Sequence, residues 1–248
     1  MTRSVMSSSS NISNINKLYE YAEKGHIKAL RQLVNTSNID INSKSDEHYH
    51  EGFTALHYAA FYGHVKCVRF LISIDRIDIN ARNEEGCTPL QVAVAEGHTE
   101  CVRVLLASPN INVNSQDTEG YTALSEAAGN GHIECLKLLL AHKDTDITIK
   151  TKTNCTVLHD AAIQGRAECL KLLLSYNLID VNAQMEGGQT ALHLACTQNH
   201  TECVKLLVTV KGIDVNIRDE HGLTPLRTAM VYNIRIPNEL LPNKRNQE

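Results

Sequence analysis

Residues 54–72 read TALHYAAFYGHVKCVRFLI, and this stretch decides the fold. Apolar residues recur at helical spacing after Thr54 and predict a short first helix, which the threonine hydroxyl can cap. Gly63 allows the left-handed backbone that ends a helix at low cost. A second apolar series over residues 65–72 predicts an antiparallel partner helix. Such a hairpin cannot bury both of its faces alone, so it needs copies of itself on either side.

The chain contains several such copies at a period of 34 residues. The repeated threonines are Thr54, Thr88, Thr122, Thr156, Thr190 and Thr224, each followed two positions later by a leucine. The turn positions are Gly63, Gly97, Gly131, Gly165 and Asn199. Because independent residue classes keep one period, we predict a stack of helical hairpins joined by finger-like turns.

A divergent unit precedes these repeats, and a truncated unit follows them. Residues 17–34 match the hairpin with Gly25 at its turn, and the polar loop after them is enlarged. At the other end, Thr224 begins a seventh first helix, and Pro237 and Pro242 cut its second helix short. Terminal units are expected to diverge because their outer faces meet water. We predict an all-α solenoid of helix-turn-helix units with β-turn fingers, comprising six full repeats and a truncated C-terminal cap.

We expect this repeat domain to be a single domain over residues 15–242, because no linker rich in Pro, Gly or Ser divides it. Residues 1–14 lack the apolar core of a secretory signal and are interpreted as a flexible N-terminal tail. Residues 243–248 are interpreted as a polar C-terminal tail.

The composition and charge of the chain exclude several function classes. The 248 residues carry a net charge of −4 at pH 7, so no global basic field attracts nucleic acid or an anionic membrane. The apolar runs are far shorter than the ~18 residues that a membrane-spanning helix requires. We therefore expect a protein partner, with neither nucleic acid nor a membrane involved, and we expect a monomer.

Five of the eight cysteines also keep the 34-residue period: Cys67, Cys101, Cys135, Cys169 and Cys203. Equivalent positions in adjacent repeats should lie roughly 8–10 Å apart, which is farther than a disulfide tolerates. We interpret these cysteines as reduced, buried core residues. They indicate a reducing compartment, the cytoplasm; delivery into a host cell is compatible with the same sequence.

The repeated segment after each of the six threonines resembles the T-P-L-H-x-A pattern of ankyrin repeat proteins, whose unit is a β-turn plus two helices. The matches read TALHYA, TPLQVA, TALSEA, TVLHDA, TALHLA and TPLRTA. The resemblance implies a module that binds other proteins through finger tips and first helices, which line a concave surface, and that catalyses nothing. It also implies that Asn182 or Asn216 is a candidate for asparaginyl hydroxylation. Asn154 replaces a turn glycine and should also tolerate a left-handed backbone.

Three residue patterns resemble catalytic or metal sites. Histidine and cysteine recur three positions apart, as in His64 and Cys67, and both residue types bind zinc. Gly-His is however the turn signature of the repeat, so we interpret these pairs as structural. We expect no metal and no other cofactor. Cys155, His159 and Asp160 include the residue types of a nucleophile, a base and an orienting acid. Nothing nearby suggests a catalytic pocket, so we predict no catalytic residue. His48 and His50 are interpreted as part of a solvated loop.

The second unit carries the candidate partner-binding surface. Five of the eleven aromatic residues lie within fourteen positions: Tyr49, Phe53, Tyr58, Phe61 and Tyr62. Aromatic side chains are favoured interface anchors, and we place Phe53 at a finger tip. The alternative is that some of them pack the enlarged loop onto the second repeat. The neighbouring units add Glu84, Glu85, Glu96, Glu119, Tyr121 and Glu126 to the candidate surface.

An acidic strip beside an aromatic patch suits a partner segment with basic and apolar residues. The sequence therefore favours a non-catalytic module that binds a partner protein through a concave surface and finger tips. The alternative is a regulatory or inhibitory subunit that occludes an enzyme. A third hypothesis, an enzyme with an unrecognised site, has no pocket signature in its favour.

Overall fold

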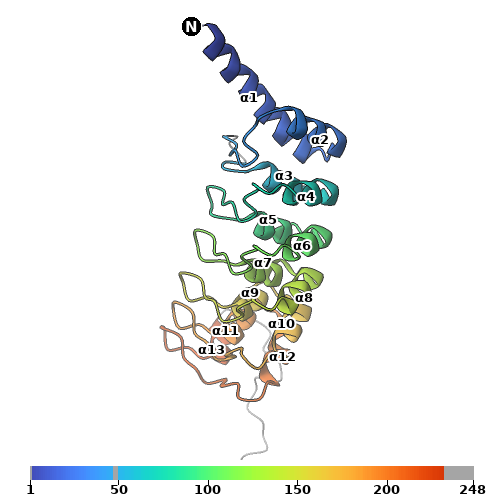
Figure 1. Cartoon of the computed structure of the whole chain (residues 1–248). Helices are drawn as coiled ribbons and strands as arrows, with labels where there is room; N and C mark the ends of the chain where they lie inside the picture. The colour runs from blue at the N-terminus through green and yellow to red at the C-terminus, as the bar shows by residue number, and fades with distance from the viewer. Residues whose placement is uncertain (1, 47–49, 232–248) are drawn as a thin grey trace, which may run out of the picture. The chain divides into compact units, whose positions relative to one another are not determined.

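The computed structural model describes residues 2–46 and 50–231, and this part of the chain contains thirteen helices and no strand. The helices are α1 Thr2–Glu23, α2 Ile27–Thr36, α3 Ala55–Phe61, α4 Val65–Ile72, α5 Pro89–Ala95, α6 Thr99–Leu106, α7 Ala123–Asn130, α8 Ile133–Ala141, α9 Val157–Ile163, α10 Ala167–Leu173, α11 Ala191–Thr197, α12 Thr201–Val208 and α13 Pro225–Val231. They alternate as the first and second helices of successive repeats (Figure 1). The predicted all-α repeat fold is confirmed.

Each first helix from α3 onward begins directly after a threonine of the repeated series. The Thr54 hydroxyl accepts a hydrogen bond from the His57 N–H, and the His57 ring accepts one from the Thr54 N–H. This reciprocal capping box satisfies N–H groups that a helix terminus otherwise leaves without a partner. The N-cap role predicted for Thr54 is confirmed.

The same histidine joins its repeat to the next one. Because a backbone N–H can only donate, the Nδ1 atom of His57 is the acceptor and Nε2 carries the proton. Nε2 donates to the carbonyl oxygen of Cys87, thirty residues later, at 3.0 Å. The equivalent bonds run from His159 to Gln189 at 3.2 Å and from His193 to Leu223 at 3.1 Å. One ring therefore caps a helix and fixes the position of the following repeat.

The turn between the two helices of a repeat also interlocks with its neighbour. Gly63 has a φ of +70°, and a Cβ atom there would lie 2.6 Å from Nδ1 of His98. His98 in turn donates from Nε2 to the carbonyl oxygen of Phe61 at 2.7 Å. Asn154 and Asn199 both have a φ of 59°, which confirms the left-handed backbone expected at Asn154 and shows the same conformation at the turn position Asn199.

The loops between repeats are fixed by asparagine side chains. The Asn80 amide donates to the Asn110 carbonyl, and its oxygen accepts from the Asn112 N–H, both at 2.8 Å. Asn182 makes the equivalent two bonds to Gly212 and Asp214. The side-chain amide of each asparagine is thus engaged by the backbone of the following repeat.

The core consists of small and aliphatic side chains, including the cysteine series. All eight cysteines lie in the described part of the chain and are thiols. The five at the 34-residue period are each at most 2% exposed, which confirms them as core residues. Burial raises the pKa of Cys101 and of Cys203 to about 11, so their thiolate forms are disfavoured.

The helices form two compact units. Among the described residues, unit 1 holds those up to 118 together with 137–145, and unit 2 holds 119–136 together with those from 146 onward. In unit 1, first helices pack on first helices (α1 on α3, α3 on α5) and second on second (α2 on α4, α4 on α6). Unit 2 repeats this arrangement with α7, α9, α11 and α13, and with α10 on α12. The prediction of one domain over 15–242 stays a prediction.

The described chain begins with a helix, because residues 2–14 belong to α1. The interpretation of residues 1–14 as a flexible N-terminal tail stays a prediction. No proline or glycine interrupts residues 2–24, so a helix anchored in the first repeat can propagate towards the N-terminus.

The segment with Pro237 and Pro242 and the tail over 243–248 lie outside the described residues. None of the described helices is both long enough and apolar enough to cross a bilayer.

The buried His57 should make stability depend on pH. Burial lowers its pKa to about 4, whereas the unfolded chain binds the proton near the ordinary value of about 6.5. The free energy of unfolding should therefore fall as the pH drops from about 6.5 towards 4. His57→Gln should remove the His57 contribution to this dependence and keep the cap, because Gln91 already forms the same capping box at the equivalent position.

Urea unfolding at pH 7 and pH 5 measures this effect. From pH 7 to pH 5 the free energy of unfolding of the wild-type chain should fall by about 2 kcal/mol more than that of the variant. The same pH dependence in both proteins would contradict the assignment of a neutral, capping histidine.

Candidate protein-binding surface

Six rings from the first two repeats form an aromatic cluster in unit 1: Tyr19, His50, Phe53, Tyr58, Phe61 and Tyr62. His50 lies at its centre, with ring centroids 4.8 Å from Phe53, 5.3 Å from Tyr58 and 5.2 Å from Phe61. Tilted and edge-on arrangements predominate, as aromatic pairs prefer. The enlarged loop and the helix α3 are therefore held together by ring contacts.

The base of the aromatic cluster is buried. Phe53 is 6% exposed and Tyr58 is 1% exposed, and the Tyr58 hydroxyl donates to Oγ of Ser45 at 3.0 Å. The placement of Phe53 at a finger tip is wrong, because it directly precedes the N-cap and its ring packs on Tyr58 at 5.4 Å. This contact is the hydrophobic staple that fixes the entry of a chain into a helix. Both residues pack the loop, as the alternative interpretation expected, and neither presents a side chain to a partner.

The other edge of the cluster is open to solvent. Tyr62 is 37% exposed and ends α3, and the half-buried Phe61 lies beside it with ring centroids 5.0 Å apart. The Tyr62 hydroxyl lies 3.5 Å from Nε2 of His50. Tyr49 lies outside the described residues. Sequence reasoning missed His50 because it counted only Phe and Tyr as aromatic anchors; its position beside Tyr49 was the available signal.

Acidic side chains of unit 1 are exposed on the elements next to the aromatic loop and α3. Glu84 and Glu85 are exposed on the finger that follows the aromatic loop, and the Glu84 N–H donates to the Glu51 carbonyl at 3.2 Å. Glu96 is exposed at the end of α5, the position equivalent to Tyr62 on α3, and these two helices pack together. We call the set His50, Phe61, Tyr62, Glu84, Glu85 and Glu96 the aromatic–acidic surface.

The remaining predicted residues belong to unit 2. Glu119 is exposed at a finger, and its carbonyl accepts from the Lys152 N–H at 3.1 Å. Tyr121 and Glu126 are half-buried, and Glu126 accepts a hydrogen bond from the Asn130 amide at 3.1 Å. These three therefore belong to a different unit from the aromatic–acidic surface.

The Cys155, His159 and Asp160 set does not form a catalytic arrangement. Nδ1 of His159 accepts from the Thr156 backbone N–H and Nε2 donates to the Gln189 carbonyl, so the two ring nitrogens are committed to the cap and the next repeat. The Cys155 thiol donates to Oδ1 of Asp160 at 3.3 Å. Burial raises the pKa of this thiol, which opposes formation of the nucleophilic thiolate.

The recurring histidine and cysteine pairs are also committed to structure. Nε2 of His64 donates to the Glu23 carbonyl at 2.6 Å, and Cys67 is fully buried. Across residues 2–46 and 50–231, no three His, Cys, Asp or Glu side chains come together in a way that could hold a metal ion.

Asp160 is a buried carboxyl group whose titration should appear in stability. It is 6% exposed, its Oδ2 atom has no hydrogen-bond partner among the described residues, and burial raises its pKa to about 7. The unfolded chain releases the same proton near a pKa of about 3.9. The free energy of unfolding should therefore decrease as the pH rises from about 4 to 7.

The Asp160→Asn variant removes this titration. Its free energy of unfolding, relative to that of the wild-type chain, should rise by about 3 kcal/mol between pH 5 and pH 8. Urea unfolding of both proteins at the two pH values measures the difference. A constant difference would show that Asp160 ionises at an ordinary pKa.

Models of ankyrin repeats match residues 18–117 and 110–185 (three copies) and residues 175–229 (many copies). The ankyrin repeat domain of human ASB11 is 28% identical, with a TM-score of 0.72, and the match covers 86% of this chain and 90% of that one. The ankyrin repeat domain of Bcl-3, a member of the IkappaB protein family, is 27% identical with a TM-score of 0.73, covering 86% and 92%. The comparison with curated proteins gave no match. With its helical repeats and these matches, the chain belongs to the ankyrin repeat family.

Proposed function

We propose that this protein binds a partner protein through the aromatic–acidic surface of unit 1 and catalyses no reaction. Ankyrin repeats are generally protein-interaction modules, which supports the general role. The specific site is inferred from one observation: Tyr62 is exposed beside Phe61, and the two rings pack on the buried part of the aromatic cluster. A preorganised aromatic group can bury a large area on binding at little cost in conformational entropy.

The charge around this edge defines the expected partner. Glu84, Glu85 and Glu96 are exposed on neighbouring elements. Complementary charges steer association and select the orientation of the partner. The partner segment should therefore combine an apolar or aromatic residue, which packs on Tyr62, with lysine or arginine residues that face the glutamates.

We also propose that the protein works in a reducing compartment, the cytoplasm. The buried thiols of the 34-residue series support this, because they contribute to the core as reduced side chains. An oxidising environment would favour disulfides.

Substitution of Tyr62 tests the proposed surface. Tyr62→Ala should reduce capture of the partner from the source cells about tenfold or more, because an interface anchor is lost. Tyr176→Ala is the matched control, since Tyr176 has the same 37% exposure but belongs to unit 2. Quantitative mass spectrometry of captured proteins gives the readout, and thermal unfolding of both variants should stay close to wild type.

Equal capture by the two variants would exclude the aromatic edge as the binding site. If the captured partner is an enzyme, adding the purified repeat protein to it distinguishes inhibition from scaffolding.

A further inference from the structure

The second helices of most repeats carry an acidic residue followed three positions later by a basic one. In α6, Glu100 and Arg103 lie 3.2 Å apart, and in α12, Glu202 and Lys205 lie 3.5 Å apart. The sequences of α8 and α10 keep the same order of charges. Each of these helices therefore has balanced charges at the two repeated positions.

The first two repeats depart from this pattern. The acidic position is taken by lysine in both, which gives Lys28 and Arg31 in α2 and Lys66 and Arg69 in α4. Neither helix contains an acidic residue. The two helices pack against each other within unit 1, so the four cations share one surface. We call Lys28, Arg31, Lys66 and Arg69 the basic outer patch.

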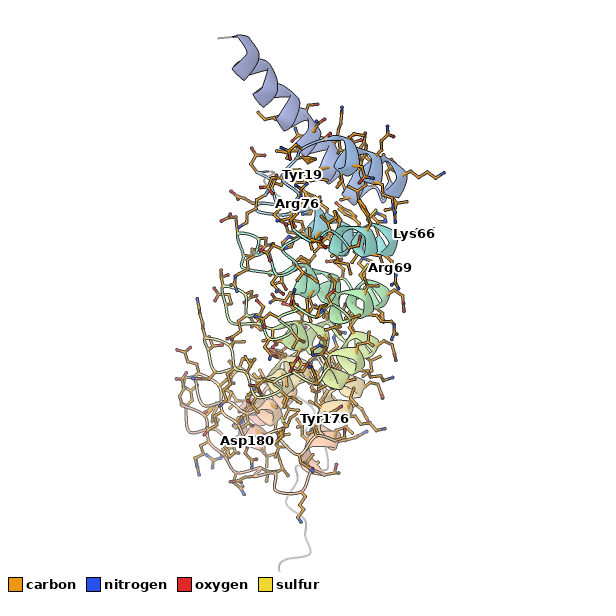
Figure 2. All side chains as sticks on the ribbon, in the orientation of Figure 1. Tyr19, Lys66, Arg69, Arg76, Tyr176 and Asp180 are labelled. Carbon is orange, nitrogen blue, oxygen red and sulfur yellow. The ribbon has the colours of Figure 1, made fainter. Side chains whose placement is uncertain are left out.

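All four side chains of the basic outer patch are exposed, and within the described part of the chain none of them forms an ion pair. Figure 2 shows Lys66 and Arg69 on the side of unit 1 that faces away from the finger loops. The Arg31 guanidinium lies 4.9 Å from the centroid of the Phe70 ring, a cation–π contact that restricts its position. Like charges three residues apart on a helix repel one another, so an anion would relieve this repulsion.

We propose that the basic outer patch docks a short acidic segment of a partner protein. Adjacent helices lie roughly 8–10 Å apart, and the two basic positions on each helix are about one turn apart. These spacings between the four cations match the spacing of a few carboxylates on a short peptide. The surface is separate from the aromatic–acidic surface, which has the opposite charge.

The limits of the patch favour a peptide over nucleic acid or a membrane. The helix α6 packs beside α4, and Glu100 of α6 occupies the position equivalent to Lys66. A nucleic acid that extends from α4 to α6 would therefore bring its phosphates close to this glutamate, which repels them. A membrane-binding helix adds exposed apolar residues to its cations. Among the side chains of unit 1 that the structure describes, the large exposed apolar residues are Ile12 and Tyr62, which lie on α1 and at the end of α3 instead.

A labelled peptide of eight glutamates tests the proposal by fluorescence anisotropy at low ionic strength, where exposed charges are least screened. The variant Lys28→Glu with Lys66→Glu should bind about tenfold more weakly than the wild-type chain. It should fold normally, because glutamate occupies the same position in α6, α8, α10 and α12. Circular dichroism and thermal unfolding check this.

The control is Lys171→Glu with Lys205→Glu, which changes the net charge equally but at second helices of unit 2. Its affinity for the peptide should stay within about twofold of wild type. An equal loss in the control, or no binding of the peptide to the wild-type chain, would overturn the proposal. Tighter binding of a short DNA duplex or of phosphatidylserine vesicles through Lys28 and Lys66 would overturn it in favour of that ligand.

Discussion

The contact between consecutive repeats is the interaction on which the rest of the structure depends. Most helices in the described part of the chain have only seven or eight residues. Helices this short are not stable in isolation. Burial of residues such as Leu56 and Leu192 against neighbouring repeats supplies the stabilisation that each hairpin lacks. The bond from Nε2 of His57 or His193 to a carbonyl thirty residues later then fixes how consecutive repeats meet within each unit.

Because the interface uses a fixed set of positions, the others are free to carry function. The capping threonines, the leucines two positions later and the turn glycines are engaged in caps and packing, as are His57, His159 and His193. Exposed side chains on the fingers and on the outer faces of the second helices, such as Glu84 and Lys66, lie outside these contacts. In unit 1 the side chains at these two places have opposite charges. Its fingers present Glu84 and Glu85, whereas its second helices present Lys66 and Arg69. One small unit thereby offers two surfaces of opposite charge without any change in its core.

Periodicity predicts whatever recurs and fails where the chain is unique. The N-caps, the left-handed backbone at Asn154 and the buried cysteines follow from comparing one repeat with the next. The enlarged loop has no counterpart in other repeats, so comparing one repeat with the next could not show that Phe53 staples the helix or that His50 centres the aromatic cluster. The pairing of α2 with α4 as neighbouring basic helices likewise became visible only once packing was known.

Hydrogen exchange monitored by mass spectrometry in the His193→Ala variant tests the central claim most directly. The substitution removes the Thr190 cap partner and the bond to Leu223 in the next repeat. If each repeat is stabilised through its neighbour, amides of α13 should lose protection together with those of α11, which packs against it. Loss of protection confined to α11, with α13 unchanged, would contradict this account.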